Sequence, residues 1–203
     1  RATGDDRYLD TAKQIVPLLE PRGVQHTHGY LTTLRGYLML YKSTGDPAIL
    51  ALAEKLYGEL VSSADFLIYG GVLEYFGMKY DRDEGCSQAD FLRLSLQLWQ
   101  ATGNLDYLER AERCMLNIFY AGQFETGDFG HRRFDETGYI PALGAGRAWW
   151  CCTMHGHRAF ADVQRCVVTR DDRGVKINLF LEGRWSGGGA TLTLARPGAT
   201  VPQ

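Results

Sequence analysis

The sequence has 203 residues, of which 45% are hydrophobic and 23% are charged, and its net charge at pH 7 is −2. A chain of this length can bury a substantial core. The near-neutral charge argues against a broad nucleic-acid-binding face or a surface for anionic membranes. No stretch approaches the roughly 20 consecutive apolar residues that a transmembrane helix needs.

Most of the chain is predicted to be helical, because apolar residues recur at helical spacing in six segments. The predicted helices are 6–20, 30–43, 47–61, 87–101, 105–120 and 154–165. Short connections between successive segments indicate antiparallel helix hairpins.

A short motif repeats between these helices. It reads Thr-Gly-Asp at 3–5 and 44–46, and Thr-Gly-Asn at 102–104. The glycine suits a left-handed helix end, and the next residue suits the cap of the following helix. Repeated helix pairs predict a stacked helical array or an α/α toroid. Because no helix precedes the first copy, we expect the chain to be a fragment.

The pattern changes after Cys166. Residues 175–181 and 190–194 alternate as strands do, and the glycine-rich turn between them predicts a hairpin. A two-stranded hairpin alone is only marginally stable, so we expect a β-domain that is truncated here. The predicted domains are a helical one at 1–166 and the beginning of a β-domain at 167–203.

The five cysteines form an odd set in a chain that is neither small nor rich in loops, which argues against a disulfide framework. Buried free thiols or a metal site fit better. Cys114 and Cys166 are predicted to be plain core residues. Reduced thiols are compatible with a cytoplasmic location, although the sequence does not fix the compartment.

Glu84, Cys86, Cys151 and Cys152 form a plausible metal set. On an extended segment, Glu84 and Cys86 would point to the same face, and the Cys151–Cys152 pair stands at a helix entrance. Three thiolates and one carboxylate suit tetrahedral Zn²⁺. Four protein ligands are typical of a structural zinc site, and two unrelated pairs of buried cysteines remain the alternative.

Glu74 follows Gly70 and Gly71 and is flanked by aromatic residues. Glycines allow a ligand to approach the backbone, and desolvation by aromatic neighbours raises a carboxyl pKa, which suits a general acid. The alternative is a surface glutamate beside a loop.

Histidines and aromatic residues are candidates for sugar contacts. His26 and His28 open the second helix, where they could cap it, bind a sugar or bind a metal, and His155 follows the cysteine pair. The aromatic residues suit either a sugar-stacking wall or the core. They are Trp149, Trp150, Tyr75 and Phe76.

Taken in order, these segments resemble glycoside hydrolase family 127, the β-L-arabinofuranosidase family. The resemblance covers about residues 1–185. The matching blocks are His26 ahead of a helix that ends in the motif at 44–46, the glycine segment leading to Glu74, Glu84-Gly85-Cys86, and Cys151-Cys152.

The resemblance implies an (α/α)6 barrel followed by β-sandwich domains, so that residues 1–166 would form the C-terminal half of the barrel. It also implies retaining hydrolysis of a β-linked arabinofuranoside. Glu84, Cys86, Cys151 and Cys152 would bind Zn²⁺, and Cys151 would also be the nucleophile. Glu74 would be the acid/base and His26 a substrate-binding residue.

Two other functions stay open. One is a non-catalytic carbohydrate-binding or scaffold relative whose zinc is structural. The other is a thiol redox protein, which the absence of a Cys-x-x-Cys motif disfavours. The sequence fixes neither the sugar, the linkage nor the oligomeric state, and a homodimer is compatible with it.

Overall fold

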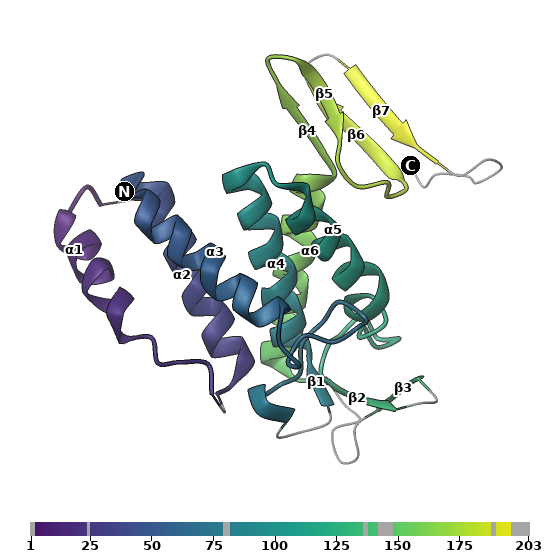
Figure 1. Ribbon diagram of the computed structural model, residues 1–203. Helices are drawn as coiled ribbons and strands as arrows, with labels where there is room; N and C mark the ends of the chain where they lie inside the picture. The colour runs from purple at the N-terminus through teal and green to yellow at the C-terminus, as the bar shows by residue number, and fades with distance from the viewer. Residues whose placement is uncertain are drawn as a thin grey trace. The chain divides into compact units, whose positions relative to one another are not determined.

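The computed structural model describes residues 3–23, 25–78, 82–135, 138–141, 148–187 and 190–195. The chain divides into two compact units, Arg1–Ala159 and Phe160–Gln203, which are described separately. Helices dominate the first unit and short strands the second (Figure 1).

All six predicted helices are present. They are α1 (Asp6–Ile15), α2 (Thr27–Thr44), α3 (Pro47–Val61), α4 (Gly85–Thr102), α5 (Leu105–Cys114) and α6 (Trp150–Val167). A 3-10 turn extends α1 over Val16–Leu18, another spans Phe76–Met78, and a π-helical turn extends α5 over Met115–Phe119. The predicted starts of α2, α4 and α6 are two to four residues too late, and the missed first turns of α4 and α6 carry three of the four candidate metal ligands.

The repeated motif forms the same turn at each hairpin. Gly45 and Gly103 have φ angles of 73° and 74°, and each donates its N–H to a helical carbonyl at 2.7 Å. Asp46 and Asn104 then cap α3 and α5 by accepting a backbone hydrogen bond. Only glycine adopts this left-handed backbone without strain. The predicted hairpin repeat is therefore confirmed.

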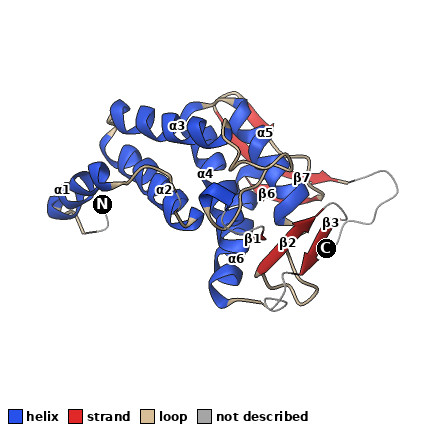
Figure 2. Ribbon diagram, turned by 60° about the horizontal axis from the view of Figure 1, so that its bottom comes forward, coloured by secondary structure: helices blue, strands red, loops and turns tan. Residues whose placement is uncertain are grey.

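The central element of the first unit is α4. It packs against α2 and α5, and α2 also packs against α3. Twelve residues of α4 are buried, so the helix is enclosed rather than amphipathic. Figure 2 shows the helices in blue and the short strands in red. The predicted mainly helical fold of helix hairpins is confirmed.

A small sheet in the first unit is absent from the predictions. It consists of β1 (Arg82–Glu84), β2 (His131–Asp135) and β3 (Gly138–Pro141), all antiparallel, in the order β1-β2-β3. The β1–β2 register places Glu84 opposite His131. The sheet therefore joins two segments of the candidate site that are far apart in the sequence.

The second unit contains two antiparallel hairpins. One is β4 (Val168–Asp171) with β5 (Gly174–Ile177), and the other is β6 (Gly183–Gly187) with β7 (Ala190–Leu194). The strand predicted at 190–194 is confirmed, whereas the one predicted at 175–181 ends at Ile177. Gly188 and Gly189 of the predicted turn lie outside the described residues. The division into a helical domain and a β-sandwich at residue 166 stays a prediction.

Across the part of the chain that the structure describes, no helix is both long and apolar enough to cross a membrane.

Candidate metal centre and active site

The structure brings the four predicted metal ligands together. One side-chain donor atom from each of Glu84, Cys86, Cys151 and Cys152 lies within 4.8 Å of the other three. The Sγ atoms of Cys86 and Cys152 are 3.6 Å apart, and those of Cys151 and Cys152 are 4.0 Å apart. Two sulfurs on a tetrahedral zinc, each at about 2.3 Å from the ion, are separated by about 3.8 Å. The donor set therefore fits a zinc ion.

Two helix entrances supply these ligands. Glu84 is the last residue of β1 and has extended backbone angles, whereas Cys86 lies in the first turn of α4. The prediction that both lie on an extended segment is thus wrong for Cys86, because the helix begins at Gly85. A Cβ atom on Gly85 would stand 3.0 Å from the Cβ of Cys152. A glycine between the two ligands therefore allows α6 to approach closely.

The three thiols are unequal. Cys86 and Cys152 are 1% and 0% exposed, whereas Cys151 is partly exposed. The Cys86 thiol donates a hydrogen bond to the Cys152 sulfur, which raises the pKa of Cys86 and lowers that of Cys152 to about 7. Burial, followed by the neighbouring Cys152, raises the pKa of Cys151. Without a metal, the exposed sulfur is therefore a protonated thiol at neutral pH.

Cys114 and Cys166 are buried and lie outside this cluster, as predicted for core residues.

His26 lies beside the cluster. Its Nε2 is 3.4 Å from Oε2 of Glu84, and its ring meets the ring of Tyr75 edge-on, with 4.9 Å between centroids. His26 is the residue before α2, and its backbone bridges to that of Tyr75. A partly exposed imidazole thus stands next to Glu84, one of the four candidate metal ligands.

Glu74 is 6% exposed, so the alternative of a surface glutamate is wrong. Its backbone holds two parts of the site together, since its carbonyl accepts from Thr27 and its N–H donates to Arg82. Its carboxylate accepts two hydrogen bonds from the Arg82 guanidinium and lies 3.5 Å from Nε2 of His131. Arg82 and His131 are site residues that the sequence predictions missed.

These neighbours determine the charge of Glu74. Burial raises the pKa of Glu74, but hydrogen bonds from His131 and Arg82 outweigh it and lower the pKa to about 2. The expectation that desolvation alone would raise this pKa is therefore wrong. Glu74 is a carboxylate at neutral pH in the free protein.

Asp90 is a further residue that the sequence predictions missed. It is fully buried on α4, and its carboxylate accepts hydrogen bonds from Arg35 and His28 at 2.5 Å and from Thr32 at 2.8 Å. His28 forms a second close group with Cys86 and His155. The spacing of four residues between Cys86 and Asp90 was the available signal, because it places both on one face of a helix.

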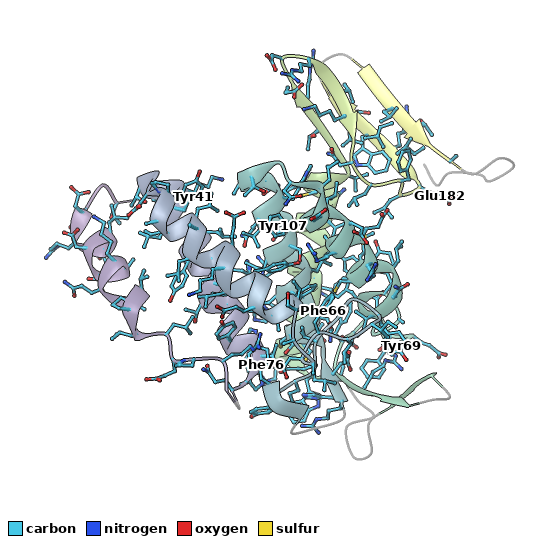
Figure 3. The ribbon with its side chains drawn as sticks, viewed as in Figure 1. Tyr41, Phe66, Tyr69, Phe76, Tyr107 and Glu182 are labelled. Carbon is cyan, nitrogen blue, oxygen red and sulfur yellow. The ribbon has the colours of Figure 1, made fainter. Side chains whose placement is uncertain are left out.

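The candidate aromatic wall splits in two. Phe76 is 1% exposed and belongs to the core, whereas Trp149 and Trp150 are 39% and 80% exposed beside the cysteine pair. The ring of Trp149 lies edge-on to His131, with 5.6 Å between centroids. Figure 3 shows Phe76 at one end of the helices, with Tyr41 and Tyr107 toward the other end.

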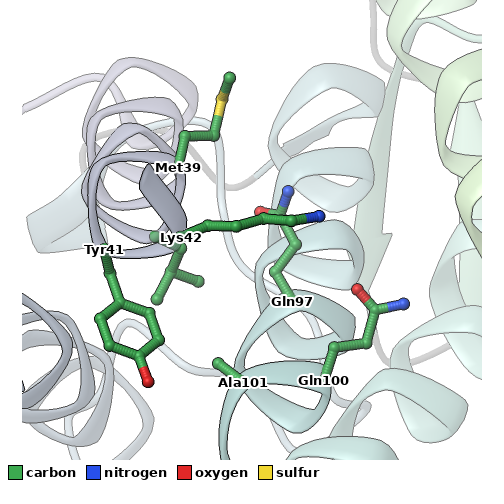
Figure 4. A pocket seen from close by; sticks show the side chains of 7 residues that line it. Met39, Tyr41, Lys42, Gln97, Gln100 and Ala101 are labelled. Carbon is green, nitrogen blue, oxygen red and sulfur yellow. The ribbon is translucent and has the colours of Figure 1, made fainter. Parts of the chain in front are cut away.

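A cavity of about 340 Å³ lies at that other end, lined by residues of α2 and α4 that include Met39, Lys42 and Gln97 (Figure 4). It holds no cysteine or carboxylate. The clustered thiols and carboxylates lie at the opposite ends of the same two helices. We therefore do not include this cavity in the candidate site.

Solved structures with the same fold include carbohydrate-active enzymes of several kinds. A GH127 β-arabinofuranosidase has a TM-score of 0.67 and 20% identity, with 90% of this chain and 33% of that chain covered. A GH127 β-L-arabinofuranosidase from Geobacillus stearothermophilus has a TM-score of 0.61 and 16% identity, with 83% of this chain and 30% of that chain covered. Cellobiose 2-epimerase from Bacillus thermoamylovorans has a TM-score of 0.62 and 14% identity, with 79% of this chain and 51% of that chain covered. At these identities the likeness establishes the fold alone.

No curated protein sequence matches the chain significantly. The chain spans about a third of the length of the two GH127 structures. The sequence profile described as the β-L-arabinofuranosidase GH127 catalytic domain matches residues 1–165, which is most of the chain. The chain therefore belongs to the GH127 β-L-arabinofuranosidase catalytic-domain family.

Proposed function

We propose that this chain is part of a retaining glycoside hydrolase that cleaves β-linked arabinofuranosides, with Cys151 as the nucleophile and Glu74 as the acid/base. The observation that carries the proposal is the unequal exposure of the clustered thiols. Cys151 is partly exposed while Cys86 and Cys152 are buried, so one sulfur can reach a substrate and two can only hold.

The ligands for a zinc ion would be Glu84, Cys86, Cys151 and Cys152. Their spacing supports this assignment, because the sulfur separations bracket the value expected for tetrahedral zinc. A bound zinc ion would keep the thiols deprotonated at neutral pH. That charge state matters because burial and the adjacent Cys152 otherwise favour the neutral Cys151 thiol.

A retaining mechanism needs a nucleophile and a proton donor at the anomeric carbon. The Cys151 sulfur would attack this carbon while Glu74 protonates the departing oxygen, leaving the sugar bound to sulfur. Glu74, now a carboxylate, would take a proton from the water molecule that releases the sugar and regenerates the thiolate. The partly exposed His26, beside Glu84, would hydrogen-bond a sugar hydroxyl.

Glu74 must gain a proton before it can act as an acid. In the free protein, Arg82 and His131 keep it ionised. We therefore expect substrate binding to break the Arg82 hydrogen bonds and to raise the Glu74 pKa. An Arg82→Gln variant tests this step. Because removing the guanidinium raises the pKa of the acid Glu74, the basic limb of the kcat/KM profile would move to higher pH. An unchanged basic limb would contradict the assignment of Glu74.

Cys151→Ser and Glu74→Gln would be compared in the complete natural protein by hydrolysis of aryl β-L-arabinofuranosides and other aryl glycosides. Each is expected to lower kcat by about 10²-fold or more. Glu59→Gln on α3 and the buried Cys114→Ser are matched controls outside the cluster. Full turnover in Glu74→Gln would remove Glu74 from the mechanism.

One alternative has an observation in its favour. Four protein ligands close a zinc coordination shell, which is typical of structural sites. A carbohydrate-binding or scaffold protein would then bind zinc at one ion per chain without cleaving any aryl glycoside. Metal content and hydrolysis, measured on the same sample, separate the two functions.

A further inference from the structure

A second layer of side chains lies one helical turn behind the candidate ligands. Asp90 follows Cys86 by four residues on α4, and His155 follows Cys151 by four residues on α6. Residues at this spacing lie on the same face of a helix. The third helix, α2, contributes His28, which lies with Cys86 and His155 in one group of close donor atoms.

Asp90 is the centre of this layer. Its exposure is 0%, and each carboxylate oxygen accepts a short hydrogen bond from α2, one from Arg35 and the other from His28. Thr32 also donates to the oxygen that His28 contacts. A buried carboxylate is costly unless charged donors compensate it, and here the donors come from a different helix.

The layer also reaches the helix that carries the cysteine pair. Nδ1 of His155 lies 3.9 Å from Asp90, and the His155 ring meets the His28 ring edge-on with 4.5 Å between centroids. Arg93 lies 3.8 Å from the same carboxylate. Asp90 thus joins α4 to α2 by hydrogen bonds and lies close to His155 of α6, which in turn contacts His28. Cys86, Cys151 and Cys152 lie about one turn away, in the first turns of α4 and α6.

We infer that Asp90 is a positioning residue for the metal centre, because its contacts with His28, Arg35 and His155 fix the spacing of the thiols on α4 and α6. The thiols are 3.6 and 4.0 Å apart, near the separation of about 3.8 Å on a tetrahedral zinc ion, and contacts outside the cluster hold the helices that carry them. Such preorganisation lowers the cost of gathering ligands, and outer partners of this kind typically change metal affinity 10- to 100-fold. The inference rests on the proposed zinc site and assigns no direct contact with substrate to Asp90.

Asp90→Asn in the full chain tests the inference, because it keeps the shape and removes the charge. Zinc affinity would be measured by competition with a chromophoric chelator, and thiolate geometry by the absorption of the Co²⁺-substituted protein. We expect a 10- to 100-fold loss of zinc affinity and a shift of the Co²⁺ ligand-field bands.

Ser95→Ala is the matched control, since Ser95 is a fully buried polar residue of the same helix that hydrogen-bonds Tyr57 instead. It should lower the urea midpoint but change zinc affinity less than about 2-fold. If Asp90→Asn does not fold, His28→Gln at the partly exposed end of the network should weaken zinc binding in the same direction.

Wild-type affinity and spectra in Asp90→Asn, or in His28→Gln where only that variant folds, would overturn the inference and leave the zinc site intact. Two ions per chain, one of them lost in His155→Ala, would make the second layer a metal site and also overturn it. No zinc in the unmodified chain would instead refute the proposed function.

Discussion

Different kinds of contact stabilise the two ends of α2 and α4. At their C-terminal ends, Gly45 and Gly103 form nearly identical turns, each followed by a capping Asp or Asn. At their N-terminal ends nothing repeats. His26 precedes one helix and Glu84 the other; the two side chains contact each other, and Glu84 also pairs with the distant His131 across β1 and β2. Local signals thus build the scaffold, while long-range contacts build the site.

This contrast makes a testable distinction. A substitution at the repeated turns should change stability without changing metal binding or chemistry. A substitution at the helix entrances should change metal content, the charge of Glu74, or the fit of α6, and each of these has its own measurement.

The largest effect is expected from Cys152→Ala. Cys152 is fully buried and contacts both other thiols of the cluster, so its loss removes the central one of the proposed zinc ligands. Near-stoichiometric zinc in the purified chain should fall to background, measured by elemental analysis. Cys114→Ala, which removes a buried thiol outside the cluster, should retain the metal. Equal zinc in both variants would rule out the four-ligand site.

The lowered pKa of Glu74 predicts that the free energy of unfolding depends on pH. Its pKa falls from 4.5 to about 2 on folding, so its contribution is complete above pH 4.5 and is lost as the pH falls toward 2. This difference corresponds to on the order of 3 kcal/mol. Urea unfolding between pH 2 and 6 should show a steeper acid loss for the wild type than for Glu74→Gln. Identical profiles would show that Arg82 and His131 do not hold this carboxylate.

Gly156→Ala is expected to cost about 1–3 kcal/mol, because its Cβ would overlap the ring of Phe129. Gly36→Ala on α2 is the matched control, since nothing lies within 4 Å of its Cβ position. That change should be neutral or stabilise the helix by up to about 1 kcal/mol. Urea midpoints measure both, and equal destabilisation would mean that α6 does not pack tightly on Phe129.

The smallest effect belongs to the repeated turn. Asp46→Ala removes the side chain that accepts from the Ala48 N–H, which should cost about 1 kcal/mol. Zinc affinity should stay at the wild-type value, because the turn lies at the far end of α2 from the cluster. A loss of zinc in this variant would erase the distinction between the two ends.

The features that the sequence predicts are the local ones, and those that it misses depend on long-range contacts. The helices and the turn at Gly45 could be predicted because helical periodicity and capping act within a few residues. Glu84, Cys86 and the cysteine pair could be proposed because their side chains are typical zinc ligands. That these four residues lie at one site was predicted from the family resemblance and not from their spacing in the sequence.

The missed residues depended on pairing across the chain. His131 reaches Glu74 only because β2 pairs with β1, and strands this short carry little signal of their own. His131 and Arg82 reverse the expected shift of the Glu74 pKa, and Asp90 reads in sequence as one of several polar residues of its helix. Burial and neighbouring charges, which decide both cases, are properties of the assembled fold.

The helix N-termini at the site also affect its charge balance. A zinc ion with one carboxylate and three thiolate ligands carries two excess negative charges. Cys86 and the cysteine pair lie in the first turns of α4 and α6, and His26 directly precedes α2. Each helix N-terminus acts as roughly half a positive charge, because its peptide dipoles align and its first N–H groups lack helical partners. If the proposed zinc ion is bound, these three helix N-termini would partly offset its excess charge, independently of the cationic side chains around the site.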